Sequence, residues 1–200
     1  MGDDMKQSAR SAGFAVLLTL LVLVAGGLLV MYTGAYNVAA TQEHTAVGRW
    51  LLNTGQERSV AVRAGDVPDP PPIDTAMVEH GFEHYRAMCV DCHGAPGVDR
   101  GEFGQGMTPT PPDLSEEAGE WSDRELFWIT KNGIKLAGMP AFGPTHSDEE
   151  IWGLVAFLRE LEGMTAEGYE DWEARFAPAE GDTAASSGHS HGPGTPAHSH

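Results

Sequence analysis

The chain has 200 residues, enough for one domain with additional segments at its ends. It carries 12 lysine and arginine residues against 29 aspartate and glutamate residues, a formal net charge of −17. This balance argues against nucleic-acid binding and against an electrostatic hold on anionic lipid, because both need a basic surface. With only two cysteines, the chain cannot contain a framework of several disulfides.

The N-terminal segment is predicted to form a transmembrane helix. Residues 14–32 read FAVLLTLLVLVAGGLLVMY and contain no charged residue. A helix of that length spans about 28 Å, close to the thickness of the hydrocarbon core of a bilayer. A secretory signal peptide has a shorter apolar region, and the one candidate cleavage site, Val38-Ala39-Ala40, is weak. We therefore expect an uncleaved anchor.

Basic residues around this segment predict its orientation. Lys6 and Arg10 precede it, whereas the first basic residue after it is Arg49. Because positively charged flanks stay in the cytoplasm, residues 1–13 are expected there, and the rest of the chain on the periplasmic, outer side of the cytoplasmic membrane. The protein is therefore expected to cross that membrane once.

Residues 33–73 are interpreted as a membrane-proximal segment followed by a proline-rich linker. Apolar residues such as Val47, Trp50 and Leu51 recur at helical spacing in this segment. Two interpretations stay open: a helix that rests at the membrane surface, or a docking element for a partner membrane subunit. The run Pro68-Asp69-Pro70-Pro71-Pro72 favours an extended polyproline II spacer and marks the boundary with the soluble domain.

Residues 74–163 are predicted to form the soluble domain. Its first helix begins at Asp74 or Thr75 and leads directly into the two cysteines. Gly81 lies inside this helix, where a glycine costs about 1 kcal/mol relative to alanine. We therefore expect another helix to approach closely at Gly81.

Two further helices are predicted from capping boxes, in which a serine is followed three residues later by a glutamate. One begins at Ser122 and ends at Asn132-Gly133, and the other begins at Ser147 and ends near Gly163. Residues 94–118 are rich in glycine and proline and are expected to form a loop. A loop of this length is unusual in a compact domain, unless it wraps around a buried cofactor.

Both cysteines occur in the run Cys89-Val90-Asp91-Cys92-His93, which has the spacing of a c-type haem attachment site. Two thiols one helical turn apart can add to two vinyl groups on one edge of a porphyrin, and the histidine that follows reaches the iron. A zinc site lacks sufficient ligands here, a thioredoxin-like motif lacks its βαβ setting, and a disulfide across two residues would be strained. The motif therefore predicts one covalently attached haem c.

Residues 74–163 resemble the class I cytochromes c, a small all-α fold around a covalent haem. The resemblance includes Cys89–His93, then Pro112-Asp113-Leu114, and then Gly138-Met139-Pro140-Ala141-Phe142, which looks like the methionine-ligand loop of that family. It implies that His93 is the proximal iron ligand and Met139 the sixth. It also implies that the Pro112 carbonyl accepts a hydrogen bond from Nδ1 of His93.

The same resemblance implies a set of residues that pack the haem or the helices around it. They are Tyr85, Leu114, Leu126, Ile129 and Phe157.

The residues themselves leave one alternative for the sixth ligand. Eight methionines are present, and most belong to the anchor or lie too near His93 in the chain to reach across the iron. Met139 is favoured, and Met107, which also lies in a loop near prolines, is the alternative. A thioether is a soft ligand that suits an electron-transfer iron and raises its potential.

Taken together, these features predict a membrane-anchored electron-transfer protein rather than an enzyme. A six-coordinate haem leaves no position for a small-molecule substrate, so we expect a redox protein or the subunits of a respiratory or dehydrogenase complex as partners. The protein would be a carrier or a permanent subunit. A peroxidase-like enzyme remains the alternative if the sixth position of the iron is open.

Several histidines lie outside the haem motif. His80 and His84 are four residues apart on a predicted helix, have no obvious third ligand and are expected at the surface, and His146 is expected to be solvated. Residues 164–200 are interpreted as a tail that is acidic at first, with a short helix bearing Tyr169, Trp172 and Phe176 that packs on the domain. From Gly181 it is expected to be disordered and rich in histidine. Metal binding by His189, His191, His198 and His200 is a further alternative function.

Overall fold

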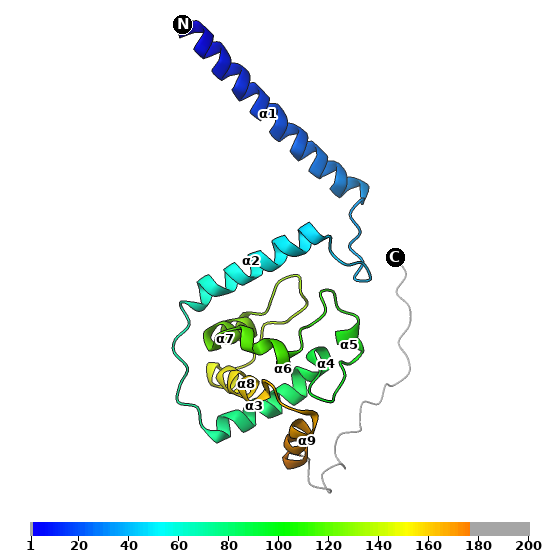
Figure 1. The fold of residues 1–200 in the computed structure, drawn as a ribbon, viewed down its shortest axis with the longest axis vertical. Coiled ribbons are helices and arrows are strands. Elements are labelled where there is room, and N and C mark those ends of the chain that lie inside the picture. Colours follow the sequence, from blue (N-terminus) through cyan, green and yellow to red (C-terminus); the bar gives the residue numbers. More distant parts are fainter. Residues whose placement is uncertain (1, 177–200) are drawn as a thin grey trace, which may run out of the picture. The chain divides into compact units, whose positions relative to one another are not determined.

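The structure is a computed structural model that describes residues 2–176 (Figure 1). Within that range all regular elements are helices, which confirms the all-α prediction. The chain divides into two compact units, residues 1–50 and residues 51–200. The division falls inside a helix, whereas the sequence placed a boundary at the proline run.

The first unit contains α1, Gly2–Thr33, a continuous helix of 32 residues. Its segment Arg10–Thr33 is long and apolar enough to cross a membrane, and no part of it is buried within the chain. A signal sequence near an N-terminus passes the same test. Helix α2, Ala46–Ala64, begins in the first unit and continues into the second.

The centre of the second unit is the crossing of α3, Thr75–Met88, with α8, Asp148–Leu161. A Cβ atom on Gly81 would lie 2.0 Å from the carbonyl oxygen of Gly153, so only glycine permits the observed contact. The close approach expected at Gly81 is thereby confirmed. Around this crossing Phe82 and Phe157 are fully buried, with their rings 5.3 Å apart.

Both predicted capping boxes are present. In α7, Asp123–Asn132, Ser122 caps the backbone of Glu125 while the Glu125 carboxylate accepts from the Ser122 backbone. Ser147 and Glu150 make the same pair of contacts at the start of α8. Helix α7 ends at Gly133, which has a positive φ of 65°, as the sequence predicted. Asp74 rather than Thr75 caps α3.

The prediction of a continuous loop over residues 94–118 was partly wrong. Two short helices occur there, α5, Glu102–Gln105, and α6, Leu114–Glu117, followed by a 3₁₀ turn, Ala118–Glu120. Asp113 caps α6 by accepting a hydrogen bond from the Ser115 backbone at 2.9 Å. Single turns of this kind depend on local caps, which the glycine and proline content obscured.

Helix α9, Ala166–Arg175, packs on the domain, as the sequence indicated. Tyr169 is buried, and the rings of Tyr169, Trp172 and Phe176 lie 5.8, 5.3 and 5.2 Å from the ring of Phe82. The domain therefore extends beyond the sequence-based limit of Gly163. The four histidines of the tail named above lie outside the described residues.

Candidate haem-binding site

The cysteine and histidine motif forms a tight helical corner at the end of α3. Cys89 closes α3 and precedes the one-turn helix α4, Val90–His93. The backbone N–H groups of Cys92 and His93 donate to the carbonyl of Cys89 at 3.1 and 2.8 Å. Both cysteines are free and half-buried. The turn thus places two thiols and an imidazole in one short stretch of regular backbone.

Tyr85 fixes the far end of this corner. Its hydroxyl donates a 2.7 Å hydrogen bond to the carbonyl of Gly94, directly after the motif. Burial is the main cause that raises the pKa of Tyr85, so the hydroxyl remains a protonated donor at neutral pH. Gly94 has a φ of 72° and turns the chain sharply away from α4. Tyr85 therefore contributes to the position of the motif as well as to the core.

His93 is oriented by a backbone carbonyl. Its Nδ1 lies 2.9 Å from the carbonyl oxygen of Pro112. Burial lowers the pKa of His93, although the hydrogen bond to Pro112 opposes this effect. The imidazole is therefore neutral at neutral pH. Because a carbonyl only accepts, the proton lies on Nδ1 and the lone pair of Nε2 is free to bind a metal.

The thiols do not have the properties of a redox-active pair. Burial, assisted by the nearby Cys92, raises the pKa of Cys89 to about 12. Catalytic thiols of the Cys-x-x-Cys type have lowered pKa values, because the thiolate is the reactive species. A protonated, half-buried thiol in a helical setting argues against thiol–disulfide exchange and leaves cofactor attachment as the explanation of the motif.

Arg100 provides the test of whether this pocket suits a haem. Its Nε atom is buried and has no hydrogen-bond partner among residues 2–176. Its positive charge acts on the imidazole of His93, in addition to burial. A buried N–H group without a partner is costly, and haem carries two anionic propionates that could accept from it. The two thiols, the neutral imidazole and the unsatisfied Nε atom of Arg100 together fit a covalent haem.

Arg100 was not identified from the sequence. It lies seven residues after His93 in the segment that was interpreted as a loop around a cofactor. It could have been identified as the only basic residue in the glycine-rich segment 94–118 of a strongly acidic chain. Its burial depends on how that loop folds back on α4, where the backbone N–H of Gly101 donates to the carbonyl of Asp91 at 2.8 Å.

Met139 lies in a turn that follows α7 and is held by backbone contacts. The N–H of Ile134 donates to the carbonyl of Met139 at 3.2 Å, and the N–H of Phe142 donates to the carbonyl of Thr130 at 3.2 Å. A Cβ atom on Gly133 would lie 2.7 Å from the Met139 carbonyl oxygen, so glycine is needed there. The backbone of this turn is therefore closely defined, and Met139 is half-buried.

The alternative ligand, Met107, lies beside the same turn. Its Cε atom would be 2.6 Å from a Cβ atom on Gly138, and its side chain is also half-buried. The folded chain thus brings both sulfur-bearing loops together. The assignment of the sixth ligand to Met139 rather than Met107 stays a prediction.

The predicted packing residues occupy different depths. Phe157 and Leu126 are buried, and the ring of Phe157 lies 5.3 Å from that of Tyr85. Leu114, which opens α6, and Ile129 are half-buried. Phe157 and Leu126 belong to the helix core, which leaves the partly exposed residues to line the pocket.

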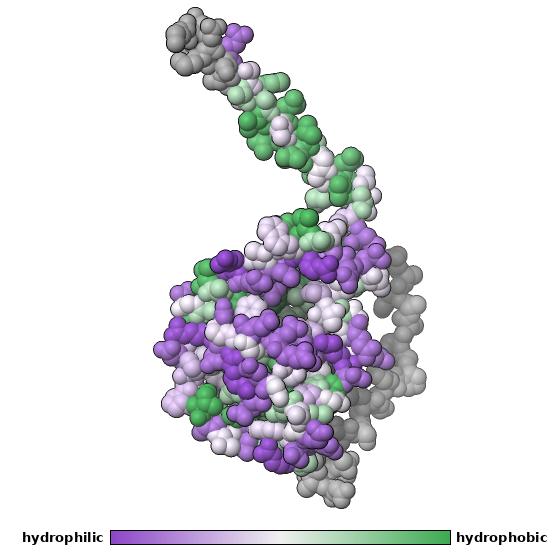
Figure 2. Space-filling view, in the orientation of Figure 1, coloured by the Kyte–Doolittle hydropathy of each residue, from purple (hydrophilic) through white to green (hydrophobic). Residues whose placement is uncertain are grey.

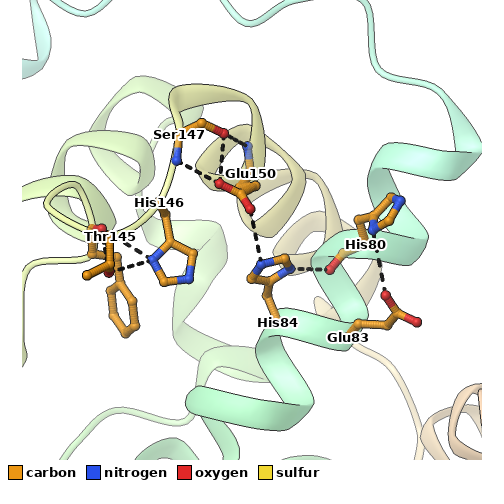
Figure 3. Close-up of polar contacts among 8 residues, drawn as sticks. His80, Glu83, His84, Thr145, His146, Ser147 and Glu150 are labelled. Atoms are coloured by element: carbon orange, nitrogen blue, oxygen red, sulfur yellow. Dashed lines mark hydrogen bonds and ion pairs between the residues drawn. The ribbon is translucent and has the colours of Figure 1, made fainter.

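Among residues 2–176, the histidines outside the motif do not form a metal centre. Figure 3 shows that His80 and His84 point away from each other, and His80 lies 3.6 Å from Glu83. His84 instead lies 3.8 Å from Glu150, and its ring is 5.4 Å from that of His146. No group of three or more potential metal ligands was found among the described residues.

This contact corrects the expectation that His84 and His146 are simply solvated. Both rings are partly buried where α3 passes the start of α8, a neighbourhood that only the helix crossing creates. His146 is also held by the Thr145 hydroxyl, 2.9 Å from its Nδ1 (Figure 3).

Comparison with known proteins agrees with this site. The family model described as cytochrome C oxidase, cbb3-type, subunit III matches residues 76–158. A quinohemoprotein alcohol dehydrogenase from Comamonas testosteroni is 33% identical over 100 residues, which cover 50% of this chain and 13% of that protein. The quinohemoprotein alcohol dehydrogenase ADH-IIG from Pseudomonas putida is 26% identical over 136 residues, which cover 66% of this chain and 18% of that protein.

The chain thus spans less than a fifth of the length of these curated relatives. The range matched by the family model includes the Cys89–His93 corner and the turn of Met139. Residues 76–158 therefore form a cytochrome c domain with a covalently bound haem c.

Proposed function

We propose that the protein is a membrane-anchored carrier of single electrons. Its haem c would be attached through Cys89 and Cys92 and ligated by His93 and Met139. The observation that carries this proposal is the 2.9 Å contact between Nδ1 of His93 and the carbonyl of Pro112. That contact leaves Nε2 as the free donor atom directly beside the two thiols.

The chemistry that haem c supplies when bound is the reversible one-electron oxidation and reduction of iron. The residues of the chain hold the site for that change. His93 donates its Nε2 lone pair, and Pro112 keeps the ring in one tautomer and one orientation. Arg100 would pair with propionate charge. Met139 would hold the iron as its second axial ligand, and a fully ligated iron would exclude substrates and small ligands.

The sixth ligand is tested by a pair of substitutions with similar side chains. Met139→Leu should remove the weak methionine-to-iron charge-transfer band at the red end of the visible spectrum of the oxidised protein. It should also permit binding of carbon monoxide to the reduced protein. Met107→Leu is the matched control and should leave both properties unchanged. The reverse result would assign the ligand to Met107. An unsubstituted protein that lacks the band and already binds carbon monoxide would favour an open, peroxidase-like site.

The anchor and its orientation are supported by the apolar segment Arg10–Thr33 and by the basic residues that precede it. We propose that α1 remains attached and that the haem domain lies on the periplasmic side. N-terminal sequencing and mass measurement of the protein purified from membranes test retention of α1. Protease added to intact spheroplasts should degrade the haem domain if it lies outside, and should leave it intact if it lies in the cytoplasm.

The relatives support a class of electron donor. Both are quinohemoprotein alcohol dehydrogenases, and the matching family model is described as a cytochrome oxidase subunit. We therefore propose that this chain receives electrons from a periplasmic dehydrogenase and passes them to a terminal oxidase. The acidic surface implied by the net charge of −17 suits basic patches on such partners.

Stopped-flow spectroscopy would test this place in the chain of electron transfer. A quinoprotein dehydrogenase with its substrate should reduce the purified haem protein, and an oxidase of the cbb3 type should reoxidise it. Both rates should fall steeply with ionic strength, since interactions between opposite charges are screened by salt. Rates that do not depend on salt would contradict the electrostatic part of the proposal.

A further inference from the structure

Helix α2 has two apolar sides, and only one of them is covered. Val60 and Ala64 are buried, at 1% and 4% exposure. Val47, Leu51 and Val62 are exposed at 67%, 56% and 74%. With about 100° per residue, these three side chains and Trp50 lie within an arc of about 120° on the helix surface. The centre of this arc lies about 120° around the helix from the buried pair.

The charge of α2 is opposite to that of the whole chain. The helix contains the arginines Arg49, Arg58 and Arg63 and a single acidic residue, Glu57, a net charge of +2. The chain as a whole carries −17. Arg49 pairs with Glu43 at 3.1 Å, whereas Arg58 and Arg63 have no carboxylate partner within residues 2–176. The expectation that the chain has no electrostatic affinity for anionic lipid, drawn from its total charge, does not hold for this helix.

Its composition is that of a helix in a membrane interface. Trp50 is 64% exposed, and tryptophan concentrates at the level of the lipid headgroups. Arg58 lies within the apolar arc, where its long aliphatic stem can cover apolar surface while the guanidinium reaches the phosphates. In Figure 2, hydrophobic side chains lie next to hydrophilic ones over α2. A helix with an apolar face and arginines around it binds lipid through burial of its apolar surface and through attraction to anionic headgroups.

The connection to α1 limits where α2 can lie. Residues 34–45 join the two helices and reach about 40 Å at full extension. A hydrogen bond of 3.1 Å between the Tyr36 hydroxyl and Nδ1 of His44 brings distant parts of this connection together. If α1 spans a membrane, the first turn of α2 must therefore remain near the surface from which α1 emerges.

We infer that α2 lies in the interface of the membrane that α1 crosses, with the arc of Val47, Trp50, Leu51 and Val62 against lipid. This inference rests on the proposed membrane anchor. The second half of α2 belongs to the same compact unit as the cytochrome c domain. The haem domain is then held at the membrane surface in a restricted orientation, rather than moving freely on a flexible tether.

Spin labels on single cysteines test the inference in the complete protein. The native cysteines carry haem, so Leu51→Cys and Leu52→Cys each provide one free thiol for a nitroxide in the full chain reconstituted into vesicles of phosphatidylcholine and phosphatidylglycerol. The two leucines are adjacent and both exposed, at 56% and 45%, but they point about 100° apart. The reduced haem with two strong ligands is diamagnetic and does not broaden the signal.

Power saturation of the electron paramagnetic resonance signal then measures which medium surrounds each label. At Leu51, collisions with oxygen, which dissolves in lipid, should exceed those with a water-soluble nickel chelate several-fold. At Leu52 the chelate should dominate. A label at Leu51 that is accessible to the chelate would show α2 in water. A Leu51 label shielded from both reagents would show that a partner subunit or a second copy of the chain covers this side of α2. Each of these two results would overturn the inference.

Failure of the anchor would be distinguishable from failure of this inference. If α1 does not span the bilayer, the haem protein will be extracted from the vesicles at alkaline pH. If α1 spans but α2 does not bind lipid, the protein will stay with the vesicles while the Leu51 and Leu52 labels report equal exposure to water. The haem spectrum, recorded in the same samples, reports the ligands independently.

Discussion

Gly81 in α3 and Gly55 in α2 are both interior glycines of a helix, and they have opposite effects on packing. In α3, a Cβ atom on Gly81 would lie 2.0 Å from a backbone oxygen of α8, and 2.9 Å from Cβ of Phe157. In α2, a Cβ atom on Gly55 would have no atom within 4 Å. The same residue type therefore permits close helix packing in one place and only weakens a helix in the other.

The difference shows how the domain is built. Helix α8 is buried along most of its length, because α3 crosses it at Gly81 and Gly153. Helix α2 buries only Val60 and Ala64. Apolar residues recur at helical spacing in both helices. Among the described residues, however, the apolar face of α8 is covered by protein and that of α2 is covered only in part. We infer that lipid covers the rest of α2.

The largest expected effect comes from Gly81→Ala. The added methyl group would overlap backbone atoms that cannot rotate away, so we expect a loss of about 3 kcal/mol in the free energy of unfolding, or failure of the holoprotein to accumulate. Gly55→Ala is the matched control. It should either leave the free energy of unfolding unchanged or raise it by up to about 1 kcal/mol. Denaturant unfolding of the two holoproteins measures both changes in the free energy of unfolding. Changes of equal size would contradict the comparison of Gly81 with Gly55.

A smaller effect is expected from Tyr85→Phe, which leaves the buried carbonyl of Gly94 without its 2.7 Å partner. An unpaired buried acceptor costs about 1–3 kcal/mol. The exposed hydroxyl of Tyr36, bonded to His44 in the connection before α2, provides the control. Tyr36→Phe should change the unfolding free energy of the haem domain by less than about 0.5 kcal/mol. Chemical unfolding followed by haem absorbance distinguishes the two.

Removal of helix caps should also affect the core helix α8 more strongly than α2. Ser147→Ala removes the cap of α8, a core helix, and should cost about 1 kcal/mol of global stability. Thr45, whose hydroxyl accepts from the backbone N–H of Gly48 at 3.1 Å, lies at the start of α2. Thr45→Ala should fray only that end and leave the unfolding midpoint of the domain unchanged. Hydrogen exchange of the amides in each first turn would show the local losses.

The smallest expected effect is on the dependence of stability on acidic pH. Hydrogen bonds from the backbone and side chain of Ser147 lower the pKa of Glu150 below its ordinary value of 4.5. A depressed pKa in the folded state contributes stability above the ordinary value, and this contribution is lost as the pH falls through the lowered pKa. Because Glu150 is exposed, the effect should be small. In Ser147→Ala the fall in stability below pH 4.5 should be less steep, and an unchanged slope would contradict this assignment.

Much of the site could be predicted from the sequence because its parts are local. Cys89, Cys92 and His93 lie within one turn of backbone, and capping boxes at Ser122 and Ser147 are short patterns with a direct hydrogen-bonding cause. The contribution of Arg100 could not be predicted in this way. Its burial beside His93 arises only when the loop after α4 folds back on that helix.

Residue spacing alone determined the haem motif, the helical class and the apolar segment of α1, since each depends on contacts within a few residues or on composition. Tertiary structure decided which surfaces are covered. It placed Met107 beside the turn of Met139, brought His84 to His146 and packed α9 on the core around Phe82. Within residues 2–176 it also left one apolar side of α2 exposed. These outcomes depend on long-range packing, which a periodic pattern permits but does not specify.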